Sequence, residues 1–309
     1  ILLGNVVTHL YLGLNAVLRA SGHPKQAMYA TIATVAINTI LAPIFIFMFD
    51  WGIRGAAIAT VSAQVIALLW QLKQFNNANE LLHFRRGIFR LKRKIVFDSL
   101  AIGMSPFLMN LAACLIVILI NQGLKKYGGD LAIGAFGIVN RLVFIVVMIV
   151  MGLNQGMQPI AGYSFGAKLY DRVNKVLKLT IIYATCVTTF GFLVGMLAPN
   201  LVVGIFTSDA ELTELSATGL RITVMFFPII GFQMVTSNFF QSIGMAGKAI
   251  FLSLTRQMLI LLPCLLILPH FFGVAGVWYS MPVSDLLASL IALVMLVYQF
   301  RKFKTAAAH

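Results

Sequence analysis

Acidic residues are scarce in this sequence, with 9 Asp and Glu against 23 Lys and Arg in 309 residues. Its apolar segments therefore lack the paired carboxylates that serve general acid–base catalysis. No G-x-x-x-x-G-K-[ST] run occurs, which argues against ATP hydrolysis by a P-loop. The three cysteines, Cys114, Cys186 and Cys264, lie in apolar segments without metal-ligand spacing. We expect neither an enzyme nor a protein with a resident cofactor or metal.

Long polar stretches are also lacking, since 60% of the residues are hydrophobic, 10% are charged and the mean hydropathy is +0.93. A soluble core cannot hide this much apolar surface, so the chain is predicted to cross a membrane several times. Alternation of period two is absent, which favours an all-α protein over a β-barrel. Nine membrane spans are predicted, at residues 1–20, 27–48, 53–74, 97–122, 131–160, 178–206, 216–242, 248–269 and 274–299. Prolines inside these spans, Pro228 among them, predict bends.

The positive charges fall mostly on one side of the predicted topology. The basic run 85–94, Arg256 and the tail 301–304 are all counted on that side, and Asp209, Glu211 and Glu214 on the other. The positive-inside rule then places the C-terminus in the cytosol. In a soluble protein a net charge of +14 would suggest nucleic acid, but this topology accounts for it, so no nucleic-acid partner is expected.

A sequence repeat divides the chain. At a shift of 222 residues Gly22 matches Gly244, and after a one-residue gap Gly52 matches Gly273 and Gly55 matches Gly276. We predict the second half of a first lobe at 1–74, a basic cytosolic linker at 75–96, a second lobe at 97–300 and a cytosolic tail at 301–309. The repeat leaves room for three further spans before Ile1, giving twelve. Two related halves are typical of secondary transporters.

Polar residues inside the spans are the candidate functional residues. Asp285 is the one carboxylate deep in a span, where it either exchanges a coupling proton or pairs within the bundle. Candidates for the wall of a substrate cavity are Asn110, Asn140, Arg141 and Gln155, together with the stripe formed by Gln233, Ser237 and Asn238. Hydrogen bonds between helices are the alternative for the stripe. For Arg141 the alternative is structural pairing or snorkelling to the membrane interface.

Several runs resemble the multidrug and toxic compound extrusion (MATE) transporters: NTILAPIFIF and WGIRGAAIAT at 38–60, GLNQGMQPIAGYSFGAK at 152–168 and FFQSIGMAGKAI at 239–250. The resemblance covers essentially the whole chain as helices four to twelve, and it implies a two-lobed bundle of twelve helices. In the proton-coupled branch of that family an Asn and a Thr help to bind the coupling ion, and they match Asn38 and Thr60. The carboxylate one turn from that Asn falls at Ala42 and is missing here. The acidic residues of the sodium-driven branch also find no counterpart in the spans at 97–122 and 216–242.

The resemblance implies a multidrug antiporter that exports organic, often cationic, compounds in exchange for H⁺ or Na⁺. We expect such a protein to act as a monomer in the inner membrane of a bacterium, with the lipid bilayer and small organic substrates as its partners. A lipid-linked oligosaccharide flippase of the same broad fold is one alternative, and it would need Arg and Lys in its cavity to bind pyrophosphate. A membrane subunit of an ATP-driven transporter is the other.

Overall fold

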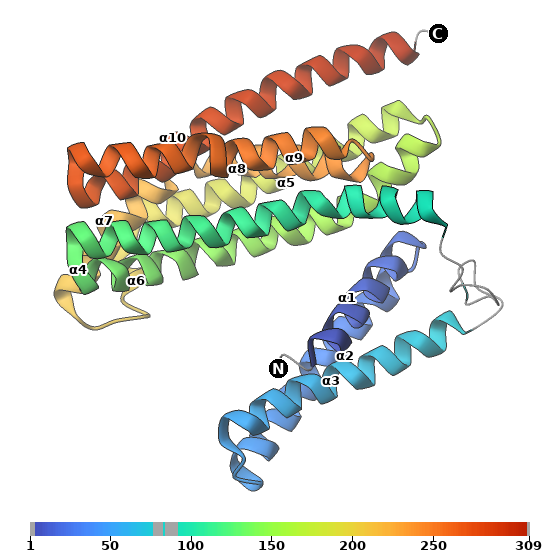
Figure 1. Ribbon diagram of the computed structural model, residues 1–309, viewed down its shortest axis with the longest axis horizontal. Helices are drawn as coiled ribbons and strands as arrows, with labels where there is room; N and C mark the ends of the chain where they lie inside the picture. The colour runs from blue at the N-terminus through green and yellow to red at the C-terminus, as the bar shows by residue number, and fades with distance from the viewer. Residues whose placement is uncertain (1–3, 77–82, 84–91, 308–309) are drawn as a thin grey trace. The chain divides into compact units, whose positions relative to one another are not determined.

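The structure is a computed structural model that describes residues 4–76, 83 and 92–307 (Figure 1). Among these residues every regular element is a helix, so the prediction of an all-α protein is confirmed. The chain divides into two compact units, residues 1–92 and 93–309. Most of the predicted linker at 75–96 lies outside the described residues, and its cytosolic location stays a prediction.

The N-terminal unit is a bundle of α1 (Asn5–Ala20), α2 (Pro24–Pro43) with its π-helical end η2 (Ile44–Met48), and α3 (Gly52–Phe75). The three helices pack on one another through small side chains, among them Ala27, Ala30, Ala59 and Ala63, which are at most 2% exposed. Small residues let helix backbones approach closely, which is how helices associate in lipid, where apolar burial offers little advantage.

The C-terminal unit contains α4 (Arg93–Gly166), α5 (Tyr170–Leu197), the short α6 (Pro199–Val203), α7 (Ala210–Val224), α8 (Phe227–Ser242), α9 (Ala246–Leu254), the π-helix η3 (Thr255–Leu261) and α10 (Leu262–Ala307). A straight helix of 74 residues would be about 110 Å long, far more than one bilayer. Instead α4 reverses at Gly129 (φ 70°, ψ −163°) and α10 reverses at Gly273 (φ 57°, ψ −132°), so each forms two antiparallel segments.

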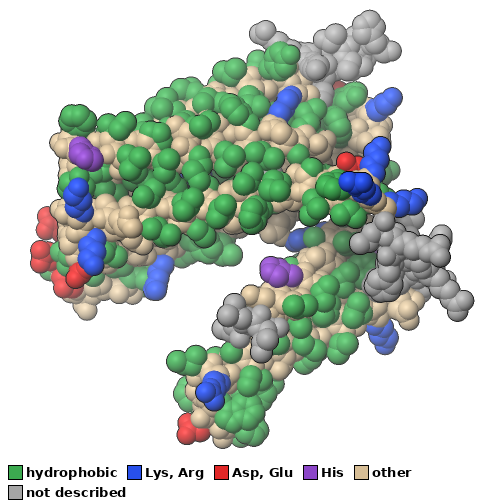
Figure 2. Space-filling model, in the orientation of Figure 1, with side chains coloured by type: hydrophobic (Ala, Val, Ile, Leu, Met, Phe, Trp, Pro, Cys, Tyr) green, Lys and Arg blue, Asp and Glu red, His purple; other side chains and the backbone are tan. Residues whose placement is uncertain are grey.

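Within the described ranges, eight segments have the length and apolarity of a membrane span once the reversals at Gly129 and Gly273 are counted and the bent pair α7–α8 is taken as one. The remaining predicted span, the first one at 1–20, corresponds to α1, which has 16 residues. Large apolar side chains are exposed along most of these helices. In the C-terminal unit they cover the visible face, and charged side chains gather toward the ends of the bundle (Figure 2). This distribution suits lipid contact, and the chain is a polytopic membrane protein.

Two predicted spans differ from the structure. The span at 178–206 is wrong at its end, because α5 stops at Leu197 and Pro199 opens the separate helix α6. A proline disfavours helical backbone at the residue before it, and Ala198 leaves the helical conformation (φ −133°, ψ 46°). The span at 216–242 is broken as well: α7 and α8 meet at an angle of 54°, next to Pro228.

The repeat seen in the sequence is confirmed by backbone geometry. The turn glycines Gly22 and Gly244 have φ of 91° and 76°, and Gly52 and Gly273 have φ of 50° and 57°. Residues that carry a side chain rarely adopt a positive φ, which explains why glycine recurs at these turns. Each turn joins equivalent helices in its own unit, so the hairpin of α2 and α3 corresponds to the hairpin that starts at α9 and ends with the second segment of α10.

Candidate functional site

A cavity of about 200 Å³ lies inside the C-terminal unit. Both segments of α4, the junction of α7 and α8, η3 and the second segment of α10 form its wall. Most of this wall is apolar. Its polar side chains are Asn140, Thr223, Arg256, Gln257, Ser284 and Asp285. An apolar cavity with a few convergent polar groups is the usual form of a small-molecule site.

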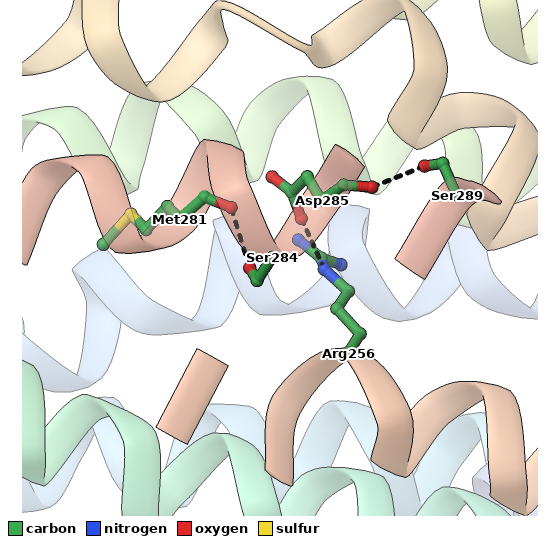
Figure 3. Close-up of polar contacts among 5 residues, drawn as sticks. All are labelled: Arg256, Met281, Ser284, Asp285 and Ser289. Carbon is green, nitrogen blue, oxygen red and sulfur yellow. Dashed lines mark hydrogen bonds and ion pairs between the residues drawn. The ribbon is translucent and has the colours of Figure 1, made fainter. Parts of the chain in front are cut away.

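An ion pair stands at the edge of this cavity (Figure 3). Arg256 Nε donates to Asp285 Oδ1 across 2.7 Å, and the two side chains are 31% and 4% exposed. Burying a lone carboxylate is costly, whereas a hydrogen-bonded partner of opposite charge offsets much of that cost. Of the two roles that the sequence left open for Asp285, the structure shows pairing within the bundle.

The helix around Arg256 is irregular. Residues Thr255–Leu261 form a π-helical turn between α9 and α10, and such turns are frequent at functional sites. A π turn accommodates one more residue than an α turn, so it changes the direction in which its side chains point. Arg256 is the second residue of this segment and is thereby placed opposite Asp285 on α10.

Hydroxyl groups near the pair bond mainly to their own helices. Ser284 Oγ donates to the Met281 carbonyl at 2.7 Å, and Ser289 Oγ donates to the Asp285 carbonyl at 2.6 Å (Figure 3). Thr223 Oγ1 donates to the Gly219 carbonyl at 2.8 Å. Ser284 and Ser289 therefore use their hydroxyl hydrogens within their own helix, whereas Thr223 Oγ1 also lies 4.0 Å from Met281 Sδ on α10. The oxygens of Thr223 and Ser284 can still accept hydrogen bonds at the cavity.

The N-terminal unit brings together the two residues that the family resemblance pointed to. Thr60 Oγ1 on α3 donates to Asn38 Oδ1 on α2 at 3.4 Å and also to the Ala56 carbonyl at 3.0 Å. Asn38 is half-buried and Thr60 is exposed. Ala42 follows Asn38 by one turn of α2, so no carboxylate stands there. The geometry shows contact between the two residues, and their role in ion binding stays a prediction.

The predicted cavity residues separate into groups. Asn140 lines the same cavity as Asp285, whereas Arg141 and Gln155 are exposed residues of α4 that are not among its lining residues. Asn110, exposed on the first segment of α4, donates from Nδ2 to the Pro106 carbonyl at 2.9 Å.

The polar stripe of α8 lies within helix packing. Gln233 is 4% exposed, and Ser237 Oγ is 2.9 Å from Ser253 Oγ on α9. Asn238 donates from Nδ2 to the Met234 carbonyl at 2.9 Å and accepts from Gln158 Nε2 at 3.3 Å. None of the three lines the cavity described above. These contacts are the hydrogen bonds between helices that the sequence left open as an alternative.

Sequence analysis missed four polar residues of the cavity, namely Thr223, Arg256, Gln257 and Ser284. The charge count groups Arg256 with the cytosolic charges, and its side of the membrane stays a prediction; the structure places the residue in η3, where it pairs inside the bundle. A signal was present in the sequence: one Arg and one Asp interrupt two consecutive apolar spans, where unpaired charge is expensive.

Comparison with known proteins adds to this geometry. Residues 102–266 match the MatE family model. The multidrug export protein MepA of Staphylococcus aureus is 29% identical over 296 residues, which cover 94% of this chain and 64% of MepA. The chain thus spans 64% of the length of the curated relatives it matches.

Solved structures agree. The MATE multidrug transporter DinF-BH is 34% identical with a TM-score of 0.88, and the match covers 98% of this chain and 68% of that one. A MATE crystal structure in complex with MaL6 is 22% identical and shows the fold, with a TM-score of 0.91 over 98% of this chain and 69% of that one. The family match over more than half of the chain, and the likeness that extends over nearly all of it, show that this chain belongs to the MATE family of membrane transporters.

Proposed function

We propose that this chain is part of a multidrug efflux antiporter that exports small organic, often cationic, compounds in exchange for H⁺ or Na⁺. The observation that carries the proposal is 34% identity to a MATE multidrug transporter across 98% of the chain. The name of MepA, a multidrug export protein, supports the same activity. The protein would act as a monomer in the inner membrane of a bacterium, with its C-terminus in the cytosol.

Alternating access is the proposed mechanism. Two lobes built from related repeats rock between outward-open and inward-open states, and transport requires the coupling ion and the substrate to favour different states. The turn glycines shared by the two hairpins support this proposal, because recurrence of the same turns is expected of a duplicated architecture. Broken helices such as α7–α8 supply the bends that rocking bundles use.

For ion coupling we propose the contact of Asn38 and Thr60. Both side chains offer oxygen atoms, which suit Na⁺ or the hydrogen of a protonated carboxyl group. Neither residue supplies a charge, so a carboxylate from another part of the protein would complete the site. Asp285 is a weaker candidate, because Arg256 already neutralises it.

A flippase for lipid-linked oligosaccharides is not favoured. Pyrophosphate recognition uses unpaired Arg and Lys side chains. Among the residues that line the described cavity, Arg256 is the one cation, and its charge is matched by Asp285.

Efflux by the protein as its gene encodes it tests the proposal. Cells that express it should extrude a fluorescent organic cation, and collapse of either the proton or the sodium gradient should stop extrusion. A nonfunctional expression control such as Gly276→Trp, placed where no side chain fits, corrects for passive leak. Extrusion that survives collapse of both gradients but stops on ATP depletion would point to an ATP-driven complex instead.

A further inference from the structure

The cavity of the C-terminal unit offers several hydrogen-bond acceptors beside the N–H donors of the Asn140 and Gln257 amides. The hydroxyl groups of Thr223 and Ser284 donate to backbone carbonyls, so their oxygens remain available as hydrogen-bond acceptors. Gln257 Oε1 is buried without a hydrogen-bond partner among the described residues, and Gln257 lines the cavity. Asp285 adds a carboxylate that is 4% exposed. Such a set of oxygens suits a cation that carries several N–H donors.

One cationic side chain of the protein, that of Arg256, already lines this cavity. A guanidinium has five N–H donors in a planar fork, and in Arg256 the Nε hydrogen bonds to Asp285 Oδ1 at 2.7 Å. No other Lys, Arg or His is among the described residues that line the cavity. The terminal N–H groups of Arg256 are left as donors at the edge of this cavity.

The repeat shows that this pair is particular to the second hairpin. Under the repeat shift Arg256 and Asp285 correspond to Thr34 and Gln64, a pair of positions without charge. Thr34 lies in the regular helix α2, whereas Arg256 lies in the π-helical turn η3. The C-terminal unit thus has an ion pair and a π-helical turn at one place, whereas the π-helical segment of the N-terminal hairpin lies further along its helix, at Ile44–Met48.

The same register relates this pair to the contact of Asn38 and Thr60. Asn38 corresponds to Ile260, four residues after Arg256 on the same helix. Thr60 corresponds to Met281, four residues before Asp285 on the same helix. One helical turn separates positions four residues apart. Equivalent hairpins therefore carry a polar pair at nearly equivalent depth, uncharged in the N-terminal unit and ionic in the C-terminal one.

We propose that the C-terminal unit holds a binding site for a small organic monocation of the guanidinium or alkylammonium class, and that Arg256 is its tethered occupant. The side chain neutralises Asp285 and fills the place that a free cation would take. This inference goes beyond the proposed export activity, because it concerns ligand binding by one unit and holds whichever ion drives transport. It also implies that Asp285 does not carry the coupling ion while Arg256 is in place.

Removing the tethered cation should open the site to a free one. In Arg256→Ala the buried carboxylate loses its counter-ion and the guanidinium leaves space. Ethylguanidinium restores both the charge and the planar donors, whereas ethylurea has nearly the same shape without the charge. The two ligands form a matched pair, and low millimolar concentrations lie far below those at which guanidinium salts denature proteins.

The experiment measures binding of both ligands to the detergent-purified protein, as its gene encodes it, by isothermal titration calorimetry. Arg256→Ala should bind ethylguanidinium at least tenfold more tightly than ethylurea. The unmodified protein should show a preference at least tenfold weaker, because Arg256 occupies the site there and any binding of the cation at the proposed export site is common to both proteins. Arg256→Ala/Asp285→Asn should lose the preference, because the carboxylate that attracts the cation is gone. If Arg256→Ala fails to fold, ethylguanidinium in the growth and lysis media should restore the yield of folded protein, and ethylurea should not.

Three results would overturn the inference. They are equal binding of the two ligands by Arg256→Ala, a preference in Arg256→Ala that is no stronger than in the unmodified protein, and a double variant that keeps the stronger preference. In a variant that does not fold, equal restoration of yield by both ligands, or by neither, counts equally against it. None of these results bears on drug export, so failure of this inference is distinguishable from failure of the proposed function.

Discussion

Gly55 faces the backbone of Phe45 so closely that a β-carbon on Gly55 would lie 2.5 Å from the Phe45 carbonyl oxygen. Its repeat partner Gly276 stands in the same relation to the carbonyl oxygen of Leu268. In each unit the helix after the glycine turn therefore packs directly on the backbone of the helix before it. The shared requirement explains why these two glycines survive in both halves of a repeat that has otherwise diverged.

Alanine at either glycine should destabilise its unit. The added methyl group meets backbone rather than a movable side chain, and overpacking of this kind costs about 1–3 kcal/mol. Matched controls are Gly13→Ala on α1 and Gly152→Ala on α4, where a β-carbon meets nothing within 4 Å. There alanine should be neutral or stabilising, by up to about 1 kcal/mol. Thermal unfolding in detergent measures the difference, and equal unfolding temperatures for Gly55→Ala and Gly13→Ala would contradict the close packing.

Removing one partner of the Arg256–Asp285 ion pair should destabilise the protein more than removing both partners. Arg256→Met leaves a carboxylate that is buried without a counter-ion, and loss of one partner of a buried pair costs about 3 kcal/mol. Arg256→Met/Asp285→Leu removes both charges and should recover most of that loss. Unfolding temperatures of Arg256→Met, Asp285→Leu and the double variant form a thermodynamic cycle. Additive effects would show that the two side chains do not interact.

The hydrogen bond between Ser237 and Ser253 should stabilise the packing of α8 on α9. The hydroxyls are 2.9 Å apart, and the two residues are 9% and 8% exposed. Ser237→Ala leaves the Ser253 hydroxyl without this partner and should destabilise the protein by about 1 kcal/mol, whereas alanine at both positions should be closer to neutral. Thermal unfolding and efflux are measured on the same variants. If Ser237→Ala lowers efflux while its unfolding temperature is unchanged, the residue acts on the substrate rather than in packing.

Asn38 and Thr60 should affect coupling more than folding. Both lie at a partly exposed contact, so Asn38→Ala and Thr60→Ala should change the unfolding temperature little. We expect each to weaken ion-dependent efflux at least tenfold, because an oxygen ligand of the coupling ion is lost. Thr60→Ser keeps that oxygen and is the matched control. Full ion-dependent efflux in both alanine variants would show that the coupling ion binds elsewhere.

Much of the fold could be predicted, because the apolar composition indicates the membrane spans and the glycine spacing indicates the turns between them. The turn glycines at 22, 52, 244 and 273 marked both hairpins correctly. Span ends were harder, since hydropathy continues past residue 197 although Pro199 interrupts the helix. The reversals at Gly129 and Gly273 were predicted, because Gly129 lies between the predicted spans 97–122 and 131–160, and Gly273 lies between 248–269 and 274–299.

The site was less predictable. Asp285 was found because a lone carboxylate stands out in an apolar run. Arg256 was not predicted as a site residue because it was counted only as one of the positive charges on the cytosolic side. The π-helical turn that orients its side chain depends on packing between helices rather than on local sequence. The polar stripe of α8 was found by its helical spacing. Spacing cannot tell whether such a stripe faces a cavity or a neighbouring helix, and here Ser237 and Asn238 bond to other helices.

Coupled exchange is the central claim, and proteoliposomes containing the protein as its gene encodes it test it most directly. With no ion gradient imposed, an outward gradient of an organic cation such as ethidium should drive H⁺ or Na⁺ into the vesicles, because an antiporter couples the two fluxes in both directions. The flux should vanish when the cation is at equal concentration on both sides. Cation efflux without any opposing movement of either ion would contradict the account.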